Sequence, residues 1–83
     1  MTIKVIIDTN KLKLLKDESS YNNMVYLDVE SNTKIKMEYN DDSWQVDILF
    51  KSEYDTEWNW VGSFCNRVYE GSTIEFNYGD LWT

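Results

Sequence analysis

Apolar and polar residues alternate along three stretches in the middle of the chain, residues 24–30, 34–40 and 44–51. A period of two is typical of β-strands that bury one face and expose the other. The second stretch has the strictest pattern, because lysine or glutamate occupies each position between its apolar residues. The pattern predicts a three-stranded antiparallel meander. Its inward faces would carry Val25, Leu27 and Val29, then Ile35, Met37 and Tyr39, and finally Trp44, Val46, Ile48 and Phe50.

The register of this meander is predicted by keeping apolar residues opposite apolar residues across each pair of strands. A loop at residues 31–33 pairs Leu27 with Met37. A loop at residues 40–43 then pairs Met37 with Val46. Each strand is thus expected to begin directly after a short polar loop.

The same registers match charges on the outer face of the meander. Lys36 would lie between Asp28 and Asp47 on the two neighbouring strands. Opposite charges that face each other across strands contribute roughly 0.2–1 kcal/mol per pair. A shift of one residue would remove the apolar and the charge matches together, so both support one register.

The two ends of the chain carry shorter alternating patterns. Residues 3–7 predict a strand, and residues 11–14 could return as its hairpin partner. A helix over residues 9–18 is the alternative, but it would place lysines at its start and acids at its end, against the helix dipole. We expect strand there. Residues 73–78 alternate as well and predict a final strand.

Residues 55–70 repeat apolar side chains at helical spacing, namely Trp58, Val61, Cys65 and Val68. Asp55 can cap the start of such a helix and Gly71 can follow its end. Gly62 and the scarcity of strong helix formers count against it. We predict a single α+β domain over residues 1–83, mainly an antiparallel meander with one helix near 55–70. An all-β meander is the alternative.

The charge balance restricts the partners of this chain. Fifteen acidic residues, eight basic ones and no histidine give a formal charge of −7 over 83 residues. Such a body repels nucleic acid and anionic membranes and attracts basic protein surfaces, over a Debye length of roughly 10 Å at 0.1 M salt. Four lysines against one aspartate in the first sixteen residues are the only local argument for nucleic-acid binding. We therefore expect no direct nucleic-acid partner and no membrane partner.

The compartment is predicted from what the sequence lacks. No apolar run approaches the roughly 18 residues of a membrane span. The apolar run at residues 3–7 is interrupted by Lys4, unlike the core of a signal peptide. Cys65 is the only cysteine, so no intramolecular disulfide can form. We expect a cytoplasmic protein, located in the host cytoplasm if a phage encodes it.

The chain also lacks most side chains that perform catalysis at neutral pH. Without histidine, Cys65 has no base to activate its thiol, so it is better interpreted as a small buried apolar side chain. Zinc is excluded by the same composition. The carboxylates of residues 40–43 and 53–57 lack the spacing of a calcium loop, and so short a chain has little material for a substrate cleft. No phosphate-binding, dinucleotide or nucleophile-elbow motif occurs. We expect no enzyme activity, no cofactor and no metal site.

The acidic residues have two interpretations. The simpler one is a solvated surface that maintains solubility. The functional one is a surface that presents carboxylates where a basic cleft expects phosphates. Residues 52–83 favour the second, because only Arg67 opposes their acids, and tryptophans and tyrosines typical of interface centres lie between them. The candidate partner-binding residues are Glu53, Asp55, Glu57, Trp58, Trp60, Glu70, Glu75, Asp80 and Trp82.

The chain contains no alanine and no proline, whose codons are GC-rich, but many asparagine, lysine and isoleucine residues, whose codons are AT-rich. In its small size, acidity, AT-rich coding bias and missing catalytic groups, it resembles the broad class of phage-encoded inhibitors that mimic DNA, such as anti-restriction and anti-CRISPR proteins. No stretch of residues matches a particular family, so no functional positions carry over. We expect a non-enzymatic inhibitor that mimics nucleic-acid phosphates and blocks a basic nucleic-acid-handling enzyme, such as a nuclease or another DNA-binding protein. The alternative is a small structural or assembly module that self-associates, for example as a homodimer, through a sheet edge and an aromatic surface.

Overall fold

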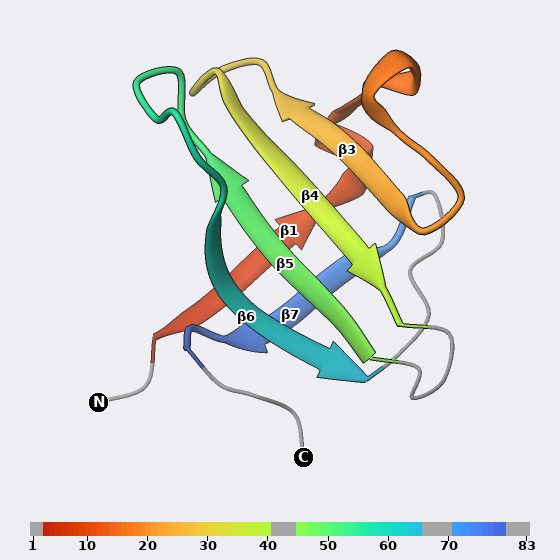
Figure 1. Ribbon diagram of the computed structural model, residues 1–83. Helices are drawn as coiled ribbons and strands as arrows, with labels where there is room; N and C mark the ends of the chain where they lie inside the picture. The colour runs from red at the N-terminus through yellow and green to blue at the C-terminus, as the bar shows by residue number, and fades with distance from the viewer. Residues whose placement is uncertain (1–2, 41–44, 66–70, 80–83) are drawn as a thin grey trace.

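The chain folds into two antiparallel sheets, one packed behind the other (Figure 1). The structure is a computed structural model that describes residues 3–40, 45–65 and 71–79. The smaller sheet pairs the two ends of the described chain, β1 (Lys4–Asp8) with β7 (Thr73–Asn77). The larger sheet is a meander in which each strand pairs with the next one along the chain. Its strands are β2 (Lys13–Leu14), β3 (Asn23–Asp28), β4 (Thr33–Tyr39), β5 (Gln45–Lys51) and β6 (Asn59–Cys65).

The predicted α+β class is wrong, and the alternative, an all-β meander, fits the structure. The helical segments in the described ranges are two 3-10 turns, η1 (Thr9–Lys11) and η2 (Lys16–Glu18). Of the helix predicted at 55–70, the part from 59 to 65 is β6, and residues 66–70 lie outside the described residues. No helix in the described part of the chain has the length and apolar character needed to cross a bilayer.

A β-bulge explains why β6 was mistaken for a helix. Ile48 of β5 pairs with Gly62, but the next residue, Leu49, pairs with Trp60, so Val61 is an extra residue on β6. An extra residue interrupts the period of two and bends the strand. The segment therefore lacks the strict alternation that predicts a strand, although its aromatic and β-branched residues favour one.

The hydrophobic core lies between the two sheets. β4 and β5 present the faces predicted for them, and β7 presents Ile74 and Phe76 as the alternation of residues 73–78 predicts. Trp44 and its loop lie outside the described residues. The buried members of the core are Ile7, Tyr26, Ile35, Met37, Val46, Ile48, Val61, Ile74 and Phe76.

The predicted register between β3 and β4 is wrong by three residues. Met24, and not Leu27, pairs with Met37, because the connecting loop spans residues 29–32 and turns through Asn32 at a φ of 55°. An odd shift exchanges the two faces of a strand. The predicted inward face of β3 is therefore wrong too: Tyr26 lies in the core and Met24 packs against it. Val29, which was predicted to face inward, lies in the loop after β3 and is 66% exposed.

The predicted register between β4 and β5 is wrong by two residues, which leaves the faces unchanged. Met37 pairs with Ile48 instead of Val46. Consequently Lys36 does not lie between two aspartates; its neighbours across the strands are Val25 and Leu49.

The flanking segments are partly as predicted. The strand at residues 3–7 is confirmed as β1, but its partner is β7 and not residues 11–14. Only Lys13 and Leu14 of that segment are in a strand, and they pair with β3. The pairing of β1 with β7 brings the ends of the described chain together behind the meander and determines which strand edges stay open.

Candidate functional site

One edge of β1 carries backbone groups that no described residue pairs with. On the edge that faces β7, Tyr78 N–H donates to the Ile3 carbonyl (2.7 Å), and Thr9 N–H donates to the Ser72 carbonyl (3.0 Å). Hydrogen-bonded and non-hydrogen-bonded pairs alternate along an antiparallel ladder. The odd-numbered residues of β1 therefore bond to β7, and the backbone groups that point away belong to Lys4, Ile6 and Asp8.

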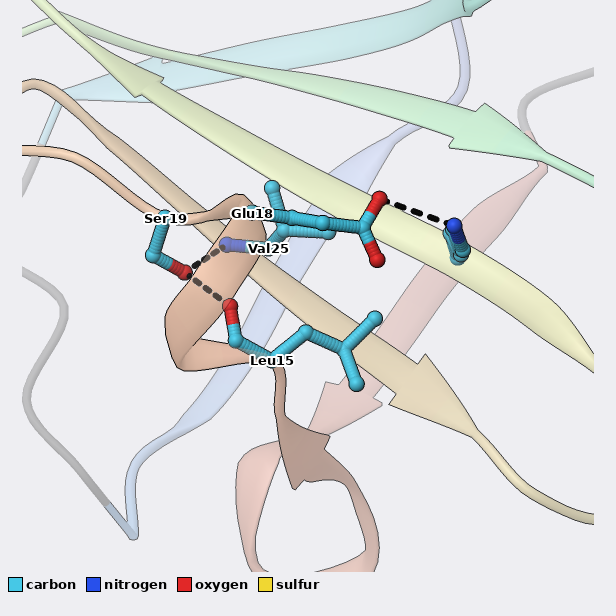
Figure 2. A network of polar contacts seen from close by, with 5 residues as sticks. Leu15, Glu18, Ser19 and Val25 are labelled. Carbon is cyan, nitrogen blue, oxygen red and sulfur yellow. Dashed lines mark hydrogen bonds and ion pairs between the residues drawn. The ribbon is translucent and has the colours of Figure 1, made fainter.

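The outer edge of the meander beside β3 is closed by the chain itself (Figure 2). The Ser19 hydroxyl accepts the Val25 N–H (3.0 Å) and donates to the Leu15 carbonyl (2.8 Å). Leu15 N–H in turn donates to the Val25 carbonyl (2.9 Å). The turn η2 is held over this edge by a bond from Lys34 Nζ to Glu18 Oε1 (2.8 Å). These contacts continue along β3 the pairing that β2 makes with Tyr26 and Leu27.

The opposite edge of the meander is closed in part. Gly79 N–H donates to the Val61 carbonyl (2.8 Å), which joins β6 to the residue that follows β7 by two positions. Within the described chain, β1 thus has an edge that remains open from Lys4 up to Asp8, which caps η1. Open edges of this kind readily pair with another strand.

An apolar groove of about 790 Å³ runs along this open edge. One wall is formed by β1 and η1, and the other by the β3–β4 loop with the neighbouring ends of β4 and β5. Ile6, which is 60% exposed, lies at the centre of the β1 wall. The apolar residues of the groove are Val5, Ile6, Ile7, Leu12, Val29, Ile35 and Phe50.

The rim of the groove is mainly acidic. Asp8, Asp28 and Glu30 line it together with one basic residue, Lys11. Asp28 Oδ1 accepts the Glu30 N–H (3.1 Å), which fixes this carboxylate at the start of the loop. An apolar floor with an acidic rim suits an extended segment that carries apolar and basic side chains.

Three of the sequence-predicted carboxylates lie together on the exposed loop between β5 and β6. Asp55 Oδ2 accepts the Ser52 N–H (2.9 Å), and this hydrogen bond is the main reason that the pKa of Asp55 is lowered. Glu53 Oε2 accepts from Asn32 Nδ2 (2.9 Å), which ties this loop to the β3–β4 loop. Glu57 is exposed beside them.

The two predicted tryptophans of the described chain lie on the outer face of the meander and already have partners. The Trp58 ring has Lys36 Nζ at 4.5 Å and Lys51 Nζ at 5.8 Å from its centre. Trp60 Nε1 donates to Asp47 Oδ1 (3.3 Å). Cation–π contacts of this kind stabilise the face they cover.

The remaining predicted residues do not complete one surface. Glu75 lies on β7, in the other sheet, where its Oε2 is 3.5 Å from Lys4 Nζ. Glu70, Asp80 and Trp82 lie outside the described residues, as does the side chain of Cys65. From the sequence, an open edge was expected on the first strand or on the last one, and residues 11–14 were expected to pair with the first; the structure pairs these two strands with each other and leaves the other edge of β1 open.

Among the described residues, no group of three or more histidine, cysteine, aspartate or glutamate side chains could hold a metal ion. Comparisons with protein-family models, with curated proteins and with solved structures find no match to this chain. The function is therefore argued from the geometry of its own surface.

Proposed function

We propose that this protein is a small, non-enzymatic assembly module that binds a polypeptide strand at the open edge of β1. The observation that carries the proposal is the row of outward-pointing backbone groups at Lys4, Ile6 and Asp8, which lies beside an apolar groove. Addition of a strand to a sheet edge gains affinity from backbone hydrogen bonds, and side-chain pockets give it specificity. The edge of β3 differs in this respect, because the Ser19 hydroxyl occupies its Val25 N–H, and this difference supports strand binding at β1.

Amide hydrogen exchange tests the proposal, because it reports separately on the two edges of β1. The probe is a synthetic peptide of alternating valine and lysine residues, chosen for the apolar floor and acidic rim of the groove. We expect the Ile6 amide to become protected when the peptide is added, whereas the Val5 and Ile7 amides, which bond to β7, are protected throughout and act as internal controls. An Ile6 amide that stays unprotected both without the peptide and at every peptide concentration would overturn the proposal.

Inhibition of a basic nucleic-acid-handling protein is the second candidate function, and one observation favours it. Glu53, Asp55 and Glu57 share an exposed loop whose position is fixed through Asn32. The test is affinity capture from a bacterial lysate at about 50 and about 500 mM salt, across which the Debye length shortens severalfold. A DNA-binding protein that is retained only at low salt, and lost in Glu57→Lys but not in the matched control Asp17→Lys, would support this function. Equal retention by both variants would reject it.

A further inference from the structure

The residues of β1 are arranged symmetrically about Ile6. Lys4 and Asp8 are each two positions away from it, and Val5 and Ile7 are each one position away. The three residues whose backbone groups point outward are the middle residue and the two charged ends. An antiparallel neighbour with the same sequence would therefore place its hydrogen-bonding residues opposite those of β1 and its charges opposite unlike charges.

We propose that the strand bound at this edge is β1 of a second copy of the chain, paired antiparallel about a two-fold axis at Ile6. This inference rests on the proposed function and names its partner. Lys4 of each copy would pair with Asp8 of the other copy, and the two Ile6 residues would pair with each other across the axis. Dimers built on one self-complementary patch are the commonest protein assemblies.

The register is specified by the charges. A shift of two residues would keep the hydrogen-bonding pattern but would leave one charged end of each strand without a partner. A parallel arrangement in register would place Lys4 beside Lys4 and Asp8 beside Asp8, and like charges at adjacent positions are destabilising. Only the antiparallel register centred on Ile6 pairs all five residues of β1 with unlike charges at both ends.

The exposed apolar side chains near this edge support the same dimer. Ile3 and Ile6 are 62% and 60% exposed, and Val29 on the other wall of the groove is 66% exposed. The two-fold axis would join the smaller sheets into one four-stranded sheet in the order β7, β1, β1, β7. Both grooves would then lie on the same face of that sheet, since the axis is perpendicular to it. The joined grooves would form a continuous apolar interface with acidic ends.

Charge-swapped variants of the full chain test this register by analytical ultracentrifugation. Lys4→Asp alone and Asp8→Lys alone place like charges opposite each other twice per dimer, so each is expected to weaken dimerisation by roughly tenfold or more. An equimolar mixture of the two variants should form a heterodimer. In it, the β1 strand of the Lys4→Asp variant carries two acidic residues, the β1 strand of the Asp8→Lys variant carries two lysines, and both charge pairs are again between unlike charges. Lys16→Asp, which makes the same charge change on η2, is the matched control and should dimerise like the parent chain.

Circular dichroism checks whether each variant is folded. Lys4 and Asp8 each have a side-chain contact within the chain, with Glu75 and with the Asn10 N–H. Ile6→Lys is a further variant that removes neither of these contacts. Two like charges at the axis should prevent its dimerisation. If the single charge variants dimerise as well as the parent, or if their mixture recovers nothing, the register is overturned. A parent chain that remains monomeric while the valine–lysine peptide protects the Ile6 amide would overturn the second copy as partner but leave the proposed function standing. If neither occurs, both proposals fail.

Discussion

At the scale of single residues, Gly62 of β6 is a position where the two sheets approach closely. A Cβ added there would lie 2.7 Å from the Phe76 ring and 3.3 Å from the Asn77 carbonyl oxygen. Gly62→Ala should therefore lower the free energy of unfolding by about 1–3 kcal/mol, the usual cost of overpacking. Urea unfolding measures this change.

A substitution of Phe76 tests whether the contact between Gly62 and the Phe76 ring causes this loss. If the ring is what the new methyl group meets, Phe76→Leu should cost stability alone but should relieve part of the damage in the Gly62→Ala background. A double-mutant cycle would then give a favourable coupling between the two positions. Additive effects would mean that the sheets can separate slightly at β6 and that the contact does not determine their spacing.

Asp55 supplies a prediction about pH. Hydrogen bonds from the Ser52 backbone and side chain lower its pKa from the ordinary value of 3.8. Because the folded-state pKa lies below the unfolded one, the contribution to stability is present above the unfolded value and is lost as the pH falls through the folded value. An NMR titration should give Asp55 a pKa below 3.8. Ser52→Ala should raise this pKa only part of the way back to 3.8, since the Ser52 backbone N–H, which the variant keeps, is the larger cause of the shift. A pKa of Asp55 at or above 3.8 would contradict the hydrogen bond from the Ser52 N–H to its carboxylate.

At the scale of elements, the Ser19 hydroxyl closes the edge of β3 at Val25, beyond the end of β2. Ser19→Ala would leave the Val25 N–H without its partner, and a buried unsatisfied donor costs roughly 1–3 kcal/mol. We expect unfolding at lower denaturant concentration and faster exchange of the Val25 amide. Ser20→Ala is the control, because the Ser20 hydroxyl has only a 3.4 Å exposed contact with Asn23 Nδ2. Similar losses in the two variants would show that Ser19 does not act as a cap.

The elements also show which parts of the fold the sequence can predict. The faces of β4 and β5 were correct because lysines, glutamate and aspartate alternate with their apolar residues. The face of β3 was wrong because residues 24–27 are apolar or aromatic on both sides, so that the turn at Asn32, and not the pattern, decides which side is buried. The prediction of a helix where β6 lies was wrong because a bulge at Val61 interrupts the period of two from which a strand is predicted.

The candidate site was predictable only in part, for a related reason. Glu53, Asp55 and Glu57 lie on one loop because they are close in sequence. The open edge of β1 results from pairing between the two ends of the chain, a contact that no local pattern encodes. The choice of Trp58 as a partner-binding residue could not anticipate Lys36 over its ring, since that contact depends on the actual register of β4 against β5.

At the scale of the whole molecule, the charge of −7 separates the two candidate functions by the sign of a salt effect. Two copies of the chain repel each other at long range, whereas an acidic inhibitor and a basic target attract each other. The Debye length falls from roughly 30 Å at 0.01 M salt to roughly 3 Å at 1 M. Added salt should therefore strengthen a β1–β1 dimer and weaken an inhibitor complex.

The exposed pairs between Lys4 and Asp8 oppose this trend, but exposed ion pairs contribute only about 0–1 kcal/mol each. Backbone hydrogen bonds and apolar contacts in the groove respond little to screening, so relief of the long-range repulsion should dominate. Sedimentation equilibrium of the parent chain over a range of sodium chloride concentrations measures the dimer dissociation constant directly. A constant that falls as salt rises fits strand pairing between two acidic bodies. A constant that rises with salt would mean that the interface is held by unlike charges well beyond β1, and the arrangement about Ile6 would then be the wrong one.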